Sequence, residues 1–265
     1  MMMQRFLKDI KKYYRYAVYS AKAELKAEVA GSYLNWVWWI LEPICLMLIY
    51  TFIFGVVFDA REEYFTAFIY IGLTVWTFFN QNLKNSVKIV KKNKSVVSKV
   101  YLPKFILVES KMFVNGFKML ISFAIVIFLM IVYRVPLTWN VLYAIPLFLC
   151  LILVSFGMMC IVCHFGVFVE DLQNVITIAL RLVFYMTGIM FSIDKRIGAK
   201  NPALAAVLGK CNPMAFIITS LRNCLLYGET PARKVMLIWM VIGVVLSLIG
   251  VRMIYKNENS YVKVI

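Results

Sequence analysis

The sequence predicts an all-α integral membrane protein with six transmembrane helices, and three observations support this fold class. Of its 265 residues, 63% are hydrophobic and only 16% are charged, whereas soluble domains are about 45–50% apolar and about 25% charged. The apolar residues gather in six runs close to the ~20 residues that a helix needs to cross a bilayer. The 29 Lys and Arg outnumber the 13 Asp and Glu and mostly flank these runs, as topology signals do. A soluble enzyme, a disordered chain and an outer-membrane barrel are therefore excluded.

Residues 1–35 are predicted to form an amphipathic helix. They hold seven Lys or Arg and lack the short apolar core of a signal peptide, so we expect no cleaved leader. Apolar and aromatic residues recur at steps of three and four from Leu7 to Leu25. This spacing favours a helix lying on the membrane surface, and a helix packed on a soluble partner would show the same stripe.

Six spans follow within a single permease domain, residues 1–265. Three of them contain one charged residue each, namely Glu42, Lys118 and Arg181. Lys118 is close enough to an interface for its ammonium to reach water, whereas Arg181 is about 14 Å deep at 1.5 Å per residue and needs a partner. The predicted spans cover residues 36–58, 64–83, 112–133, 141–163, 172–190 and 235–251.

The distribution of basic residues predicts that both termini are cytoplasmic. The N-terminal segment, the loop 84–111 and the C-terminal tail together hold 18 Lys and Arg, while the two short links on the opposite side hold two. Cytoplasmic loops carry such an excess.

The extracytoplasmic segment 191–234 is too apolar for a plain loop. It contains two hydrophobic stretches that are each too short to span, so we expect short re-entrant helices. Asn212 followed by Pro213 is typical of a helix N-cap and first helical residue. Arg222 lies within this helix and requires a protein-lined or wet environment.

Catalytic chemistry is not expected of this chain. The sequence contains no G-x-x-x-x-G-K-[ST] phosphate loop and only one His. Cys160, Cys163 and His164 spell the haem-attachment pattern C-x-x-C-H, but they end an apolar span, where buried thiols are the expected interpretation. Cys211 and Cys224 both lie outside and could form a disulfide.

Several features occur together in one order along the chain. They are the basic amphipathic N-terminus, Trp-x-Trp-Trp-x-x-Glu-Pro at residues 36–43, Tyr-Leu-Pro-Lys at residues 101–104, and Asn212-Pro213 with Arg222 and Gly228 before the last span. In this order they resemble the ABC-2 family of transporter permeases. Within it, the chain is similar to the branch that exports lipid-linked polysaccharides such as O-antigen and teichoic acid.

The resemblance implies a homodimer in the bacterial cytoplasmic membrane that works with two copies of a separate ABC ATPase. ATP and Mg would bind the ATPase, so no cofactor is expected in this chain. Membrane lipids and a lipid-linked glycan are the other expected partners, and nucleic acid is not. Two alternatives remain: an ABC-2 permease for a drug or lipid, and a membrane enzyme or scaffold without transport, which the small number of acidic and His residues in the spans disfavours.

The resemblance also implies a coupling helix at residues 85–97 that docks on the ATPase. Three apolar residues would supply its packing contacts, and four lysines would meet the ATPase or lipid phosphates. The apolar residues are Val87, Ile89 and Val90, and the lysines are Lys88, Lys91, Lys92 and Lys94. A solvated basic loop that only sets topology is the alternative.

The resemblance further implies a translocation path along spans one and five, which line the conduit in the exporters that the chain resembles. Aromatic side chains suit sugar rings, and the candidates are Tyr50, Phe54, Phe184 and Tyr185. The same residues could simply pack against neighbours or lipid. The charged candidates are Glu42 and Arg181, which could pair with each other, or Arg181 could meet the pyrophosphate of the substrate.

Overall fold

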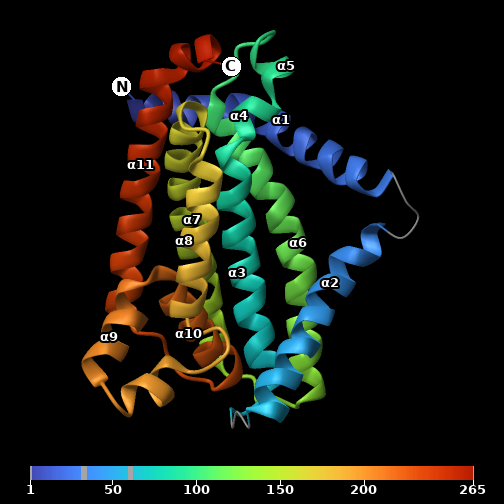
Figure 1. The fold of residues 1–265 in the computed structure, drawn as a ribbon, viewed down its shortest axis with the longest axis vertical. Helices are drawn as coiled ribbons and strands as arrows, with labels where there is room; N and C mark the ends of the chain where they lie inside the picture. The colour runs from blue at the N-terminus through green and yellow to red at the C-terminus, as the bar shows by residue number, and fades with distance from the viewer. Residues whose placement is uncertain (1, 31–34, 59–61, 265) are drawn as a thin grey trace.

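A computed structural model describes residues 2–30, 35–58 and 62–264, and within these residues the fold is entirely helical, without strands (Figure 1). The long helices are α1 (Met2–Ala30), α2 (Asn35–Tyr50), α3 (Phe65–Val87), α6 (Lys104–Val132), α7 (Ala144–Phe168), α8 (Leu172–Met186), α9 (Pro202–Cys211), α10 (Pro213–Leu226) and α11 (Arg233–Val264). The short segments are η1 (Thr51–Val57), α4 (Ile89–Lys92), α5 (Lys94–Val97), η2 (Trp139–Tyr143) and η3 (Asp194–Gly198).

Four helical stretches among the described residues are long and apolar enough to cross a membrane, and a fifth results if the bent pair α9–α10 counts as one span. The four are Trp36–Val57, Lys104–Val132, Trp139–Phe168 and Arg233–Tyr261. The predicted spans two and five correspond to α3 and α8, which fall outside this set. The second half of α3 is rich in amides, and α8 has only 15 residues.

Two helices extend well beyond the predicted spans. α6 begins at Lys104 rather than at residue 112, and α11 continues to Val264 rather than ending near 251. Hydropathy marks where apolar composition ends, whereas backbone hydrogen bonding continues through polar residues. The extra turns of both helices lie at the end of the bundle that also holds α4, α5 and the two termini (Figure 1).

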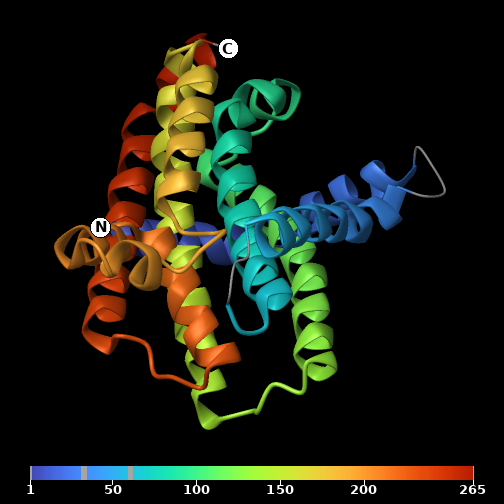
Figure 2. The ribbon, with the colours of Figure 1, turned by 60° about the horizontal axis from the view of Figure 1, so that its bottom comes forward.

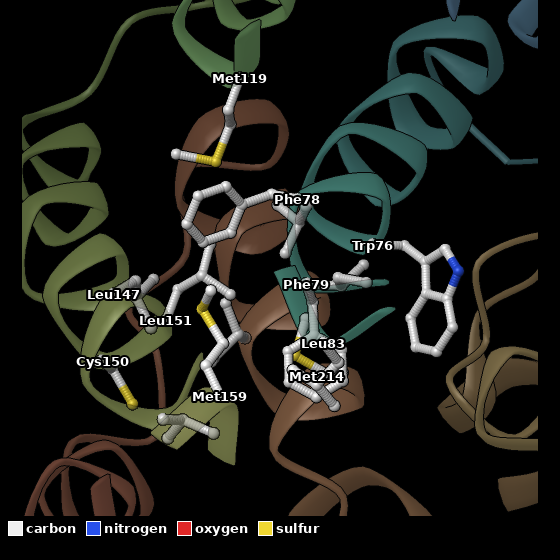
Figure 3. Close-up of a cluster of buried hydrophobic side chains, with 14 of the residues drawn as sticks. Trp76, Phe78, Phe79, Leu83, Met119, Leu147, Cys150, Leu151, Met159 and Met214 are labelled. Atoms are coloured by element: carbon white, nitrogen blue, oxygen red, sulfur yellow. The ribbon is translucent and has the colours of Figure 1, made fainter. Parts of the chain in front are cut away.

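α3 lies at the centre of the bundle, between α6, α7, α8 and α10 (Figure 1). Its aromatic side chains Phe78 and Phe79 are almost fully buried and belong to one cluster with Met119 of α6 and Leu151 of α7 (Figure 3). α7 and α11 pack closely because Gly157 has no side chain: a Cβ there would lie 2.6 Å from the backbone nitrogen of Ser247. Small residues permit such close contact between membrane helices.

The predicted amphipathic helix is present as α1, which crosses one end of the bundle and projects beside α2 (Figure 2). Its apolar stripe packs on α6 of the same chain, with the rings of Phe6 and Phe105 5.1 Å apart. Ala17 and Ala21 on this stripe are buried. The stripe therefore has an intramolecular partner, which periodicity alone does not identify.

α9 and α10 meet at an angle of 95°. The predicted N-cap is confirmed, because the side-chain oxygen of Asn212 accepts from the N–H groups of Met214 and Ala215 at 3.0 and 3.4 Å. Near this bend, the indole N–H of Trp239 donates to the carbonyl of Lys210 at 2.9 Å. Trp239 lies six residues after the start of α11, so the end of α9 contacts α11 about 9 Å along the axis of that helix.

Candidate coupling and translocation sites

The predicted coupling segment 85–97 consists of the end of α3 followed by the two short helices α4 and α5. Asn93 separates them, and its side-chain amide donates to the carbonyl of Ile89 at 2.8 Å. The backbone N–H of Asn93 donates to the same carbonyl at 3.2 Å, so Asn93 ends α4 with two hydrogen bonds to Ile89. The segment thus forms a compact turn at the end of α3.

The three apolar residues of this segment are buried within the chain itself. Val87, Ile89 and Val90 are 2%, 5% and 1% exposed. Val87 also lies directly against Gly166 of α7, where an added Cβ would collide with the Val87 carbonyl oxygen. Displacement of this segment would therefore be transmitted to α7 through backbone contact.

The surface left for a partner is basic. Lys88, Lys92 and Lys94 are exposed, and Lys91 is partly exposed. The Lys91 ammonium lies 3.7 Å from the Glu170 carboxylate, which follows α7. This ion pair is largely solvated, so it contributes little to the stability of the fold.

A network that we call the terminal clamp joins three distant parts of the chain at the same end of the bundle. It comprises Arg5, Asp9, Tyr101, Tyr255 and Glu258. The Arg5 guanidinium donates to the Tyr101 hydroxyl at 2.7 Å and to Glu258 at 2.9 Å. The Tyr255 hydroxyl donates to Asp9 at 2.7 Å, and Arg5 lies 4.3 Å from the centre of the Tyr255 ring. The clamp holds α1 and the loop before α6 against α11.

Two members of the clamp, Arg5 and Tyr101, have raised pKa values. The hydrogen bond to Glu258 raises the pKa of Arg5 further above its ordinary value. Burial raises the pKa of the Tyr101 hydroxyl. Arg5 thus stays charged and Tyr101 stays a neutral donor.

The sequence prediction missed Glu258 because the last span ended at residue 251. A usable signal was present: Val251, Ile254, Glu258 and Tyr261 recur three and four residues apart, as on one face of a continuing helix. Val251, Ile254 and Tyr261 are buried.

Arg222 joins α10 to two other parts of the bundle. It is 2% exposed, and its guanidinium donates to the carbonyl oxygens of Phe68, Gly188 and Ile189 at 2.9, 2.9 and 2.7 Å. Its guanidinium carbon also lies 3.5 Å from the centre of the Phe68 ring. The protein-lined environment expected for this side chain is confirmed, and the partners are backbone acceptors.

The two halves of the predicted translocation path do not meet within one chain. Glu42 is on α2 and Arg181 is on α8, with α3 between these helices (Figure 1). Among the described residues, Arg181 is exposed and has no ion-pair partner. The alternative in which these two residues pair is therefore not realised within the chain.

The aromatic candidates are partly packed within the chain. The rings of Tyr50 and Phe54 are 6.3 Å apart. Phe184 contacts Trp76 of α3 edge-on at 5.5 Å, whereas Tyr185 is 75% exposed.

The cysteines are free thiols. Cys160 and Cys163 are fully buried in the core, as expected. Cys224 is buried while Cys211 is exposed, so the suggested disulfide between them is not formed. His164 is hydrogen-bonded to the Tyr261 hydroxyl at 2.6 Å, and no candidate metal-binding group occurs among the described residues.

The described residues thus form a helical bundle with several candidate membrane spans and a basic surface at the end that holds α4 and α5. The model of the ABC-2 type transporter family matches residues 18–226. The chain therefore belongs to the ABC-2 type transporter family: it is a multi-pass membrane permease domain, a transport subunit without a nucleotide-binding domain. Permeases of this family pair with ATPase subunits.

Its relatives share nearly the whole chain. The O-antigen export system permease protein RfbA of Klebsiella pneumoniae is 23% identical over 243 residues, which is 91% of this chain and 92% of the relative. The O-antigen export system permease protein RfbA of Myxococcus xanthus is 23% identical over 244 residues, 92% of this chain and 93% of the relative.

Replacing Arg222 by Leu is expected to destabilise the fold. The substitution leaves buried carbonyls without their donor and should lower the free energy of unfolding by about 3 kcal/mol. Arg222→Lys should give an intermediate loss, because an ammonium cannot reproduce the planar donor arrangement. Thermal unfolding in detergent measures both, with Arg181→Leu as an exposed control. A melting temperature of Arg222→Leu equal to that of the unsubstituted protein would refute this role.

Reversing the charges of Lys91 and Lys92 to Glu is expected to weaken coupling to the ATPase. The change turns the exposed basic surface acidic and sets a new carboxylate at position 91 beside that of Glu170, so we expect ATPase co-purification to fall about tenfold or more. Pull-down and transport-stimulated ATP hydrolysis measure the effect. The matched control is the double reversal of Lys200 and Lys210, which lie before and in α9. Retained co-purification with normal stimulation in the Lys91/Lys92 variant would contradict the prediction.

Proposed function

We propose that this chain is the permease subunit of an exporter that moves a lipid-linked polysaccharide, such as O-antigen or teichoic acid, across the bacterial cytoplasmic membrane, driven by a separate ABC ATPase. The observation that carries the proposal is the similarity to O-antigen export permeases over 91% of the chain. The whole domain is matched rather than one motif, which favours a shared class of substrate.

The proposed topology has six spans: the four helical stretches that composition identifies, together with α3 and α8. α3 runs between the two ends of the bundle, and most of its residues are buried by neighbouring helices, so it needs less apolar surface than a lipid-facing span. α9 and α10 then form a re-entrant segment, since α10 ends near Gly228, whose carbonyl accepts from Asn140 of the link between α6 and α7. The excess of basic residues favours a cytoplasmic location for both termini and α1.

A homodimer would resolve the exposure of Arg181. This side chain lies on an α8 face that also exposes Ile178 and Leu182, at 61% and 62%. An arginine facing hydrocarbon at this depth is costly, so the face favours a protein or aqueous environment. A second copy, with its own α2 and α8, would supply that environment and enclose a conduit lined by aromatic residues.

The proposed mechanism uses this chain as a mechanical transmission. Two ATPase subunits bind ATP and Mg, approach each other and displace the α4–α5 segments. The contact of Val87 with Gly166 and the terminal clamp then carry the movement to α7, α1 and α11. Nucleotide can drive this change only by binding one of the two states more tightly.

The experiment that tests the function is purification of the permease with its ATPase, followed by mass spectrometry of co-purified lipid. A lipid-linked glycan that is exported into vesicles on addition of ATP supports the proposal. Transport of a drug or of an ordinary lipid without a glycan would support an ABC-2 permease of a different substrate class. Substrate turnover by the isolated chain would instead indicate an enzyme.

Arg181→Leu is expected to abolish export without preventing assembly. The variant removes the one charge that α8 presents at mid-span, while leaving the buried packing of the helix intact. Glycan display on cells and co-purification of the ATPase measure the two effects separately. Normal glycan display by this variant would show that the residue is not in the path.

A further inference from the structure

A polar cavity lies between the end of α1 and the helices α2, α3 and α6, away from α8. Its volume is about 300 Å³. Neither the coupling segment α4–α5 nor the proposed conduit residues of α8 line it.

Two polar stripes face this cavity. On α3 the stripe is Thr74, Thr77, Gln81 and Asn85, and on α6 it is Lys111, Asn115, Lys118 and Ser122. The members of each stripe are three or four residues apart, so each stripe occupies one helix face about 16 Å long. Polar faces inside a membrane are costly and mark sites where water or a ligand is bound.

The cavity wall contains a polar group without a partner. Thr74 is 5% exposed, and its hydroxyl has no hydrogen bond. Asn115, which is 7% exposed, donates to Asn82 at 2.7 Å and holds its own side chain at the wall. A buried hydroxyl without a partner costs free energy unless a bound molecule satisfies it.

The charges of the cavity are unevenly compensated. Lys118 pairs with Glu28 of α1 at 2.6 Å, and Lys111 pairs with Glu24. Glu42 of α2 lines the same cavity and has no ion-pair partner among the described residues. The cavity therefore offers one uncompensated carboxylate, together with lysines whose remaining N–H groups can still donate.

Further groups suited to a cation lie beside Glu42. Trp38 and Trp39 line the cavity, and tryptophan is the aromatic side chain that best attracts a cation. The Lys118 ammonium already lies 5.4 Å from the centre of the Trp39 ring. The Trp38 ring, one helical turn before Glu42, therefore remains for a second cation. Pro43 is inside α2 and has no N–H to donate to the carbonyl of Trp39. The carboxylate, the Trp38 indole and this carbonyl together favour an ammonium group.

We propose that this cavity binds the headgroup of a zwitterionic phospholipid that carries a primary ammonium. The ammonium lies at Glu42 and the indole of Trp38, and the phosphate accepts from Lys118 and from the amides of the two stripes. The acyl chains lie against the exposed apolar surface of α2 and α6, where Leu46 and Leu120 are 39% and 66% exposed. This lipid site goes beyond the transport function and does not depend on it.

The test is native mass spectrometry of the delipidated full-length chain, titrated with phosphatidylethanolamine or phosphatidylglycerol of the same acyl chains. We expect phosphatidylethanolamine to bind about tenfold more tightly, because only its headgroup carries the ammonium that Glu42 attracts. Glu42→Gln should remove this preference while phosphatidylglycerol binding is retained. The control Glu170→Gln, an exposed carboxylate outside the cavity, should keep the preference.

A second pair of variants tests the polar stripes. Lys118→Gln should weaken the binding of both lipids, since both carry the phosphate. Thr74→Val conserves the shape of the side chain and should weaken the binding of phosphatidylethanolamine. Circular dichroism and gel filtration verify folding of each variant. Equal or tighter binding of phosphatidylglycerol by the unsubstituted chain, or an unchanged preference in Glu42→Gln, would overturn the proposal.

Discussion

The bundle is organised by one constraint: hydrocarbon supplies no hydrogen bonds, so polar groups within the spans are stabilised by partners inside the protein. Arg222 shows this most clearly. Its guanidinium binds carbonyls of α3 and of the segment after α8, and thereby holds α10 in a fixed position against both. The amide of Asn115 with Asn82 and the ion pair of Lys118 with Glu28 satisfy the same requirement between α3, α6 and α1.

The bundle has one side on which the helices pack closely and another on which helix faces are exposed. α7, α11, α3 and α10 form a tightly packed core, in which Gly157 permits backbone contact. Few residues of α2 are buried, and one face of α8 is exposed as well. The proposed mechanism uses both sides: the closely packed side would transmit movement from the α4–α5 segment, and the exposed faces would be available to lipid, substrate or a second copy.

Prediction from sequence succeeded where the signal is local. The amphipathic pattern of α1, the cap at Asn212 and the burial of Cys160 follow from a few neighbouring residues. It was less successful where the signal depends on context. α6 and α11 continue past the ends of their apolar runs, so composition alone misplaces the start of α6 and the end of α11.

The sequence by itself determined that the chain lies in a membrane, which end is basic, and that it lacks the loop needed to bind nucleotide. Tertiary structure alone decided which helix faces meet. Arg5 and Glu258 are 253 positions apart and yet share a hydrogen bond, and Glu42 lies on the opposite side of α3 from Arg181. Such pairings result from the packing of distant segments, and helical periodicity specifies which residues share a face but not which face they contact.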